Sequence, residues 1–504
     1  MSATSAPTST FCPQASRKYV LAAAILASSM GFIDGSVVSV AMPAIRADIG
    51  ASLAEAQWIS NAYALTLSAL ILAGGAAGDR FGLRQTFIFG IAFFAIASVA
   101  CAMAPDAQIL IAFRALQGCG AAIMVPCSLA IIAKAYPKNE RAAAIGIWAS
   151  ASAVTSALGP AIGGLALSLF DDSVWRAIFA INLPLGAISI FLLAVKVPAD
   201  RPAASKRLDL AGAILATIGF GALAFGLTAL GEGSREISAT PAIVIGLLAI
   251  AAFVWWERII REPMVDLSLF AIPAFAGANI ATFLLYFSLS AILFFLPMAL
   301  IAGWGISPAE TGLLFLPLSV AIALLSGGVG KWSGRVGAKW PIAIGCAVVA
   351  LAFLALGLMT HAGWQSFWGN AFPAMVVMGL GMALVVSPLS AVVMTVVDDD
   401  RTGSASGINN AVSRVAGLIA VASMGAVASW VYASAIGADA ASMPEFGAMA
   451  PAGLDTAFES IRIAASDTAF AAVAYVSAGF CLLAAVISLL TIPGGRQESD
   501  QIQA

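Results

Sequence analysis

Long apolar segments recur along the whole chain, and they constrain its fold more than any other feature. A bilayer core about 30 Å thick is crossed by roughly 20 apolar residues in a helix. Fourteen segments meet this requirement, at residues 19–43, 56–77, 86–104, 107–133, 143–169, 176–196, 210–230, 240–256, 273–302, 310–330, 340–360, 368–396, 405–432 and 466–492. Their hydrophobicity is continuous, which favours helices over the alternating strands of a membrane barrel. The sequence therefore predicts an all-α polytopic membrane protein.

Composition excludes several classes of function. Hydrophobic residues make up 61% of the 504 residues and charged residues 10%, against roughly 25% charged residues in soluble domains. The net charge of −2 offers no basic surface to nucleic acid. His361 is the single histidine, which argues against a His-ligated metal centre. We expect no metal, no cofactor and no nucleic-acid partner, and we expect that the protein is not an enzyme.

Basic residues are distributed unevenly between the two sides of the predicted bundle. With a cytoplasmic N-terminus, 18 of the 24 Lys and Arg residues fall in inner segments and 4 in outer loops. Basic loops stay on the cytoplasmic side. We therefore predict that both termini are cytoplasmic and that the protein is a multi-pass protein of the inner (plasma) membrane.

An internal repeat divides the chain. The loop Gly75–Arg84 is echoed 255 residues later by Gly330–Lys339, with Gly, Arg and Gly in register. Repeats of this kind are typical of secondary transporters. The predicted units are a tail at 1–18, a six-helix bundle at 19–197, a linker at 198–209, two additional helices at 210–257, a linker at 258–272, a second six-helix bundle at 273–492 with a long outer loop at 433–465, and a tail at 493–504.

Few charged residues stand inside the apolar segments, and these are the candidates for chemistry. Asp34 is the one carboxylate clearly within a segment, and Arg114 lies at a similar depth with Gln117 one helical turn further in. Such charges are costly in lipid, so they face a cavity or a partner. A proton-coupling role for Asp34 stands beside the alternative of a fixed internal salt bridge. Arg414 and Asn410 are a second polar group, for which helix packing is the alternative.

Glycine-rich motifs supply a second class of candidates. Gly159, Pro160, Gly163 and Gly164 allow close approach of helices and a bend, and we expect them to close the inner leak path or simply to pack. The inner loop carries Gly75, Asp79, Arg80, Gly82 and Arg84. Its charges form either a conformational lock or a solvated turn that sets topology.

These motifs resemble those of a known family. Gly75–Arg84 is similar to the loop signature of the major facilitator superfamily, and Arg114-Ala-Leu-Gln-Gly-Cys-Gly120 to its fourth-helix motif. Gly159–Gly164 resembles the fifth-helix motif of its antiporters, with Thr155 at a position that usually holds glycine. Phe32–Pro43 and Trp175–Pro184 resemble the fourteen-span drug:proton antiporter family.

The resemblance implies the major facilitator fold, with two six-helix bundles and two extra central helices. It also implies a proton-coupling role for Arg114 and a contact of Asp79 with the helix that starts near Thr402. No P-loop pattern is present, so a proton gradient is the expected energy source. We expect efflux of lipophilic, cationic small molecules in exchange for protons by alternating access. The alternative is a dedicated exporter of one endogenous metabolite, antibiotic or siderophore, and nothing in the sequence identifies a periplasmic adaptor.

Overall fold

The computed structural model describes residues 11–200, 209–231, 236–398, 401–437, 443–451 and 453–494; the core of the predicted linker, 201–208, and the tail from 495 lie outside it. Fourteen helical segments in this part of the chain are long and apolar enough to cross a bilayer, which confirms the predicted fold class. The helices are α1 Gln14–Ile49, α2 Leu53–Phe81, α3 Leu83–Ala102, α4 Ala107–Ala135, α5 Lys138–Leu169, α6 Trp175–Ala180, α7 Asn182–Lys196, α8 Leu210–Leu230, α9 Glu236–Ile259, α10 Pro273–Met298, α11 Pro308–Leu313, α12 Leu316–Val336, α13 Lys339–His361, α14 Phe372–Thr395, α15 Thr402–Ile436 and α16 Thr456–Thr491.

Two of the predicted spans are each broken into two helices. The sixth span contains α6 and α7, and the tenth contains α11 and α12. Pro184 stands four residues after Ala180, and Pro317 four residues after Leu313, which are the last residues of α6 and α11. Proline has no N–H to donate to the carbonyl four residues earlier. The helix therefore ends and restarts at both places.

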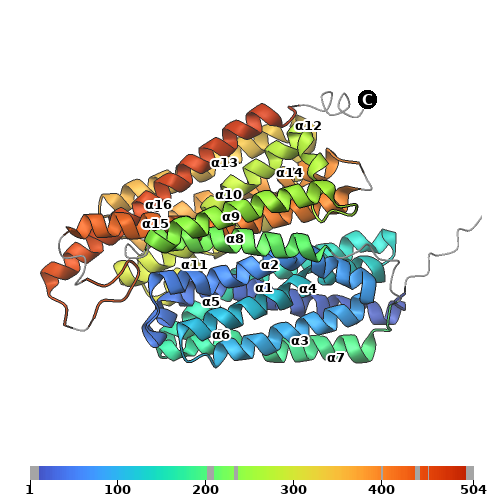
Figure 1. Ribbon diagram of the computed structural model, residues 1–504, viewed down its shortest axis with the longest axis horizontal. Helices are drawn as coiled ribbons and strands as arrows, with labels where there is room; N and C mark the ends of the chain where they lie inside the picture. The colour runs from blue at the N-terminus through green and yellow to red at the C-terminus, as the bar shows by residue number, and fades with distance from the viewer. Residues whose placement is uncertain are drawn as a thin grey trace, which may run out of the picture.

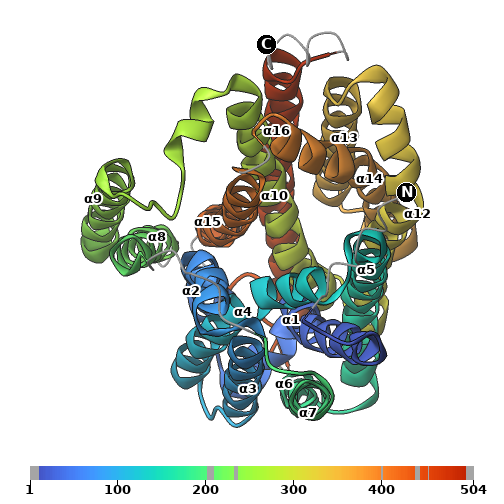
Figure 2. The ribbon, with the colours of Figure 1, turned by 90° about the vertical axis from the view of Figure 1, so that its right-hand side faces the viewer.

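The helices fall into two groups, which Figures 1 and 2 show on opposite sides of the molecule. Helices α1–α7 form one group and α10–α16 the other. Helices α8 and α9 pack side by side, and α8 touches α2 and α15, one helix from each group. The extra pair therefore lies at the seam between the groups. The residue bounds of the two bundles and their linkers stay a prediction.

The internal repeat extends to backbone conformation. Helix α2 covers Leu53–Phe81, and α11 with α12 covers Pro308–Val336, 255 residues later. Both end at a glycine with positive φ, +94° at Gly82 and +85° at Gly337. Side chains with a Cβ disfavour this conformation. The glycines of the two loops therefore make the same turn.

The extra helices bury two carboxyl groups. Asp209 is 9% exposed and Glu257 3%. Asp209 begins α8 and accepts hydrogen bonds from the amide of Gly212 and the indole of Trp256, while Glu257 accepts from the amide of Val265. The sequence places Asp209 and Glu257 just outside the apolar segments 210–230 and 240–256 and predicts that Asp209 reaches water. The second prediction is wrong, because Asp209 is buried. The Trp256 indole covers the Asp209 carboxyl, because α9 packs along α8.

Candidate functional site

Asp34 lies near the middle of α1, and its side chain is fully buried at 0% exposure. Its carboxylate faces α4. Arg114 Nη1 donates to Asp34 Oδ2 at 2.5 Å, and Gln117 Nε2 donates to Asp34 Oδ1 at 2.9 Å. Both carboxylate oxygens therefore have partners. The structure brings together the three residues that the sequence singles out at similar depth.

Arg114 is held on several sides. It donates from Nε to the carbonyl oxygen of Ile59 on α2 at 3.0 Å, and from Nη1 to Gln117 Oε1 at 2.7 Å. Its guanidinium carbon lies 4.3 Å from the centre of the Tyr63 ring and 5.6 Å from that of Phe179. A guanidinium over an aromatic face is stabilised by the ring quadrupole. The ion pair thus joins α1, α2, α4 and α6.

Neutral polar residues support this cluster, and sequence reasoning did not assign them to it. Gln117 Nε2 and Asn182 Nδ2 donate to the Ser98 hydroxyl at 3.1 and 2.9 Å, and that hydroxyl donates to the carbonyl of Phe179. Ser98 on α3 and Asn182 on α7 are both 0% exposed. A buried amide or hydroxyl needs a partner, so Ser98 and Asn182 hold Gln117 in place. Asn182 falls inside the motif Trp175–Pro184, which was the only signal for it.

The chemistry of the cluster follows from its charges. A carboxylate without exposure is stable when ionised only beside a cation. A proton added to Asp34 would neutralise the carboxylate and leave the buried guanidinium of Arg114 without its counter-charge. Protonation of Asp34 would therefore remove the ion pair that joins α1 to α4.

Arg414 lies on α15, in the other group of helices from the Asp34 cluster. It interacts electrostatically with Tyr63 on α2 and Tyr286 on α10, and its Nε is buried without a hydrogen-bond partner. Asn410 is exposed and donates only to the carbonyl of Ser406 in its own helix. The neighbouring Asn409 bonds to Asn279 and Thr282 of α10. Arg414 and the Asp34 cluster therefore share Tyr63 as a neighbour, but no ion pair or hydrogen bond joins them among the described residues, and Asn410 belongs to neither.

The glycine motif of α5 forms a close contact between the two groups. A Cβ at Gly164 would lie 2.1 Å from the carbonyl oxygen of Pro308, at the start of α11, and one at Gly163 would lie 2.4 Å from Val37 of α1. Gly159 also meets Val37, and the carbonyl of Pro160 lies against Gly312. These residues are close to the Leu169 end of α5. The charge distribution predicts that this is the outer end.

This placement differs from one expectation. The seam around Gly164 lies towards the end of the bundle opposite the Gly75–Arg84 loop, so with the predicted orientation it would close the outer side and not the inner one. Gly164 is near the last residue of α5, Leu169, whereas the predicted inner side is at the first residue, Lys138. Towards the start of α5, Gly146 has no neighbour within 4 Å, and Ile147 and Ser150 are exposed. The groups therefore touch at the outer end and separate along the inner half of α5.

The predicted inner lock is not made in this structure. Asp79 is exposed, and the described residues show no hydrogen bond or ion pair between it and the start of α15. The guanidinium of Arg80 lies over the ring of Phe81, its neighbour. Arg401, at the start of α15, instead bonds to Asp266 and Ser268 of the segment before α10. Gly75 faces Pro126 of α4 at 3.6 Å, an ordinary contact.

Asp200, four residues after the end of α7, binds the inner loop at the start of α3. Its carboxylate accepts from the amides of Leu83 and Arg84, at the start of α3, and from Lys134 Nζ at 2.8 Å. Arg84 donates to the carbonyls of Leu193 and Ala194 in the last turn of α7. Although burial raises the pKa of the Asp200 carboxyl, Lys134 and the two amides outweigh it and hold the pKa below its usual value. The role of Arg84 is therefore to join α3 to α7.

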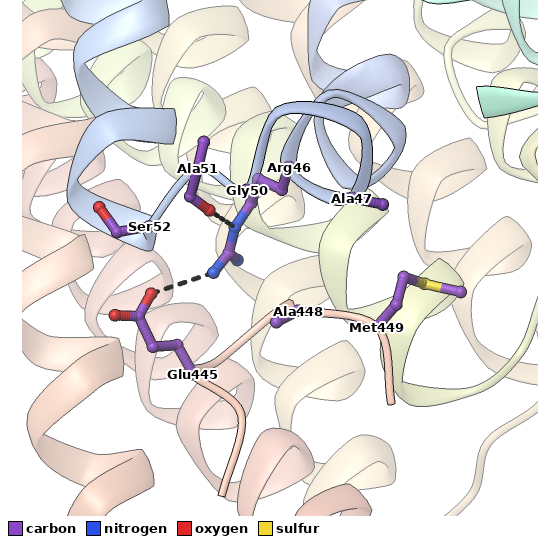
Figure 3. Close-up of a pocket in the computed structure, with 8 residues that line it drawn as sticks. All are labelled: Arg46, Ala47, Gly50, Ala51, Ser52, Glu445, Ala448 and Met449. Carbon is purple, nitrogen blue, oxygen red and sulfur yellow. Dashed lines mark hydrogen bonds and ion pairs between the residues drawn. The ribbon is translucent and has the colours of Figure 1, made fainter. Parts of the chain in front are cut away.

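A latch of two charged residues, Arg46 and Glu445, joins the turn between α1 and α2 to the loop before α16 at the predicted outer end (Figure 3). Arg46, near the end of α1, donates to Glu445 at 3.1 Å. It also donates to the carbonyl of Phe446 at 2.7 Å. Glu445 also accepts from the amide of Leu53, the first residue of α2, at 2.6 Å. A pocket of about 500 Å³ lies beside these residues, between the α1–α2 turn and the segment 445–449. The loop before α16 therefore binds the first two helices.

A second buried carboxylate appears within a span. Asp467 is the second residue of the predicted segment 466–492, so the sequence places it at a span end. Helix α16 begins at Thr456, ten residues earlier, which puts Asp467 well inside the helix, and it is 4% exposed. It accepts from the indole of Trp304 and the amide of Gln365, both at 2.7 Å. The expectation that Asp34 is the one carboxylate clearly within a segment is therefore wrong. Asp467 lies in the other group of helices from the Asp34 cluster.

Comparison with known proteins gives a consistent result. The family model described as Major Facilitator Superfamily matches residues 24–421 and 278–502. The chain is 34% identical over 426 residues to the multidrug resistance protein Stp of Mycobacterium tuberculosis, covering 81% of this chain and 76% of that protein. It is 31% identical to the tetracenomycin C resistance and export protein of Streptomyces glaucescens, covering 78% and 72%, and 32% identical to a methylenomycin A resistance protein of Bacillus subtilis, covering 82% and 89%.

Solved structures with the same fold are more distant in sequence. A bacterial homologue of the human lysosomal transporter Spinster aligns with a TM-score of 0.63 and 19% identity, covering 96% of this chain and 99% of that one. The inward-open xylose transporter XylE from E. coli aligns with a TM-score of 0.63 and 16% identity, covering 97% and 99%. At these identities the likeness shows the fold alone.

Proposed function

The chain belongs to the Major Facilitator Superfamily of membrane transporters, and we propose that it exports lipophilic small molecules in exchange for protons by alternating access. The buried pair of Asp34 and Arg114 carries this proposal. It is a titratable bond between helices at 0% and 2% exposure, so a proton can reach it only when the surrounding helices move. Proton binding and rearrangement of the transporter are then coupled steps.

Efflux is supported by the relatives. The similar proteins are named for multidrug resistance, tetracenomycin C resistance and export, and methylenomycin A resistance. A dedicated exporter of one endogenous metabolite or antibiotic stays the second candidate, favoured by the relatives that are named for a single compound. A panel of unrelated substrates separates the two, because a dedicated exporter would move only one of them.

The preference for cations expected from the sequence is not carried into this proposal. It depended on Asp34 as a carboxylate free to neutralise a substrate. Both of its oxygens have donors within the protein, and Arg114 cancels its charge. The charge of the substrate must therefore be recognised elsewhere.

Asp34→Asn tests the coupling. In inverted membrane vesicles with an imposed pH gradient, we expect this variant to lose uphill uptake of a substrate dye, because an amide cannot carry the proton. Exchange of labelled for unlabelled substrate across the same membrane needs no net proton movement, and we expect it to continue. Asp172→Asn, at an exposed carboxylate of the outer end, is the control and should behave as the wild type. Uphill uptake by Asp34→Asn at the wild-type rate would refute the coupling role.

A further inference from the structure

Arg414 differs from the other buried arginines in having no counter-charge. Arg46, Arg114 and Arg462 are each at most 5% exposed, and each pairs with a carboxylate at 3.1, 2.5 and 2.6 Å. Arg414 is partly buried, and the described residues supply no carboxylate within ion-pair distance of it. The side chains that interact with it electrostatically are the phenols of Tyr63 and Tyr286. Its positive charge is therefore uncompensated.

The position of Arg414 is suited to a transported molecule. It stands thirteenth in the 35-residue helix α15, and its two neutral partners come from α2 and α10, which belong to opposite groups of helices. It is thus at the junction of the two groups and away from both ends of its helix. An unpaired guanidinium at such a depth is unfavourable in lipid and is expected to face a partner or a cavity.

The surroundings of Arg414 restrict the chemistry of that partner. Tyr63 and Tyr286 offer phenol rings and hydroxyls. Asn410 is four residues earlier on the same helix face, and its side chain is exposed. The neighbouring residues of α15, Ala411, Val412 and Val415, are apolar and line a separate pocket of about 230 Å³. The guanidinium of Arg414 is thus a single cation surrounded by neutral polar, aromatic and apolar groups. A substrate with one anionic group on an otherwise apolar body would complement these surroundings.

The remaining charge near the junction does not oppose this assignment. The nearest acid shown to act on Tyr63 is Asp34, and Arg114 already neutralises it. Asp467 on α16 accepts from the indole of Trp304. Asp209, just before α8, accepts from the indole of Trp256, and Glu257 on α9 accepts from the amide of Val265. The junction therefore has a net positive charge from Arg414.

We infer that Arg414 is the residue that selects the charge of the substrate, and that the transporter prefers amphiphilic organic monoanions, such as aromatic carboxylates or phenolates, over cations of the same shape. The inference rests on the proposed export function. In it the substrate carboxylate or phenolate pairs with the guanidinium while its apolar body contacts the aromatic and aliphatic side chains around it. A guanidinium recognises an oxyanion through paired N–H donors.

The test uses three probes with one aromatic body: a carboxylate, its neutral methyl ester and a matched quaternary ammonium. Uptake into inverted vesicles is measured for the wild type, Arg414→Gln and Arg414→Lys, with Asp34→Asn alongside. We expect the wild type to prefer the carboxylate and Arg414→Gln to lose at least tenfold in kcat/KM for it while the ester is moved at the wild-type rate. Arg414→Lys, which keeps the charge, should recover part of the carboxylate transport. Binding of the carboxylate to purified protein should weaken in Arg414→Gln.

Three results would overturn the inference. One is a wild-type preference for the quaternary ammonium. The second is unchanged carboxylate transport in Arg414→Gln. The third is an equal loss for all three probes in a variant that is still monodisperse and melts as the wild type does, since that would make Arg414 structural. Failure of the export function is a separate result: no probe would be taken up by the wild type in response to the pH gradient, although each still bound.

Discussion

Gly164 has no space for a side chain, because a Cβ there would lie 2.1 Å from the carbonyl oxygen of Pro308. A backbone atom cannot move aside as a flexible side chain can. Gly164→Ala should therefore push α5 away from α11 and cost about 1–3 kcal/mol of the energy that keeps the outer end closed. We expect a lower melting temperature and stronger labelling of an outer-end cysteine by a membrane-impermeant reagent.

The matched control is Gly146→Ala in the same helix, where nothing lies within 4 Å of the added methyl. It should melt and label as the wild type does, and replacing glycine by alanine in a helix interior is intrinsically favourable. If Gly164→Ala behaved like Gly146→Ala, the seam would not be what closes the outer end.

The charged part of the site was predictable at the level of single residues, and the neutral part was not. Asp34 and Arg114 stand out because a charge in an apolar segment is costly and hence rare. Ser98, Asn182 and Tyr63 are ordinary residues of membrane helices, and only their packing around Gln117 and Arg114 gives them a role. Sequence also could not show that both oxygens of Asp34 have donors within the protein, and the expected preference for cations depended on a free carboxylate there.

At the scale of helices, Asp200 connects the segment after α7 to the start of α3. Asp200→Asn removes the charge that Lys134 and two amides bind, and it should cost roughly 1–2 kcal/mol of stability at pH 7. The folded-state pKa of Asp200 is lowered, so its contribution is complete above the unfolded value of about 3.9 and is lost as the pH falls through the lower folded value. The gap in stability between wild type and variant should be constant from pH 7 to about pH 4 and close below that.

Thermal unfolding across this pH range measures the gap. Asp106→Asn is the control, since Asp106 begins α4 by accepting from the amide of Ile109 and asparagine caps a helix equally well. A gap between the wild type and Asp200→Asn that widened as the pH fell would contradict the assignment.

The number and order of the helices followed from hydrophobicity, but their interruptions and neighbours did not. Pro184 and Pro317 break two spans whose composition is predominantly apolar. Because α8 and α9 fall outside the repeat, the sequence predicts that they are peripheral. In the structure, α8 contacts α2 and α15, and both helices help to line the apolar pocket with α10 and α15. Contacts between distant segments leave no periodic signal in a sequence where nearly every position is apolar.

At the scale of the whole molecule, the latch of Arg46 and Glu445 ties the end of α1 to the loop before α16, on the predicted outer side. Glu445→Ala removes one partner of a nearly buried guanidinium and the acceptor of the Leu53 amide. The Glu445 side chain is 56% exposed, so we expect a loss on the order of 1 kcal/mol, which is about a fivefold change in the ratio of closed to open outer ends.

Spin labels at Met103 and His361, at the exposed outer ends of α3 and α13, report that ratio through their distance distribution. The longer distance should gain population in Glu445→Ala and not in Asp172→Asn, which also removes an outer-end carboxylate. An unchanged distribution in Glu445→Ala would mean that the glycine seam closes the outer end without the latch.

The latch also has a consequence for the synthesis and membrane insertion of the protein. Arg46 and Glu445 are separated by 399 residues. At about 5–20 residues per second, the ribosome needs roughly 20–80 s to reach Glu445 after it has made Arg46. During that interval the outer turn carries an arginine, against the usual bias of basic residues to the cytoplasm, while its partner has not yet been synthesised. Insertion of the first helix must therefore succeed without the contact that later secures it, and only the nearly finished chain can close its outer end in this way.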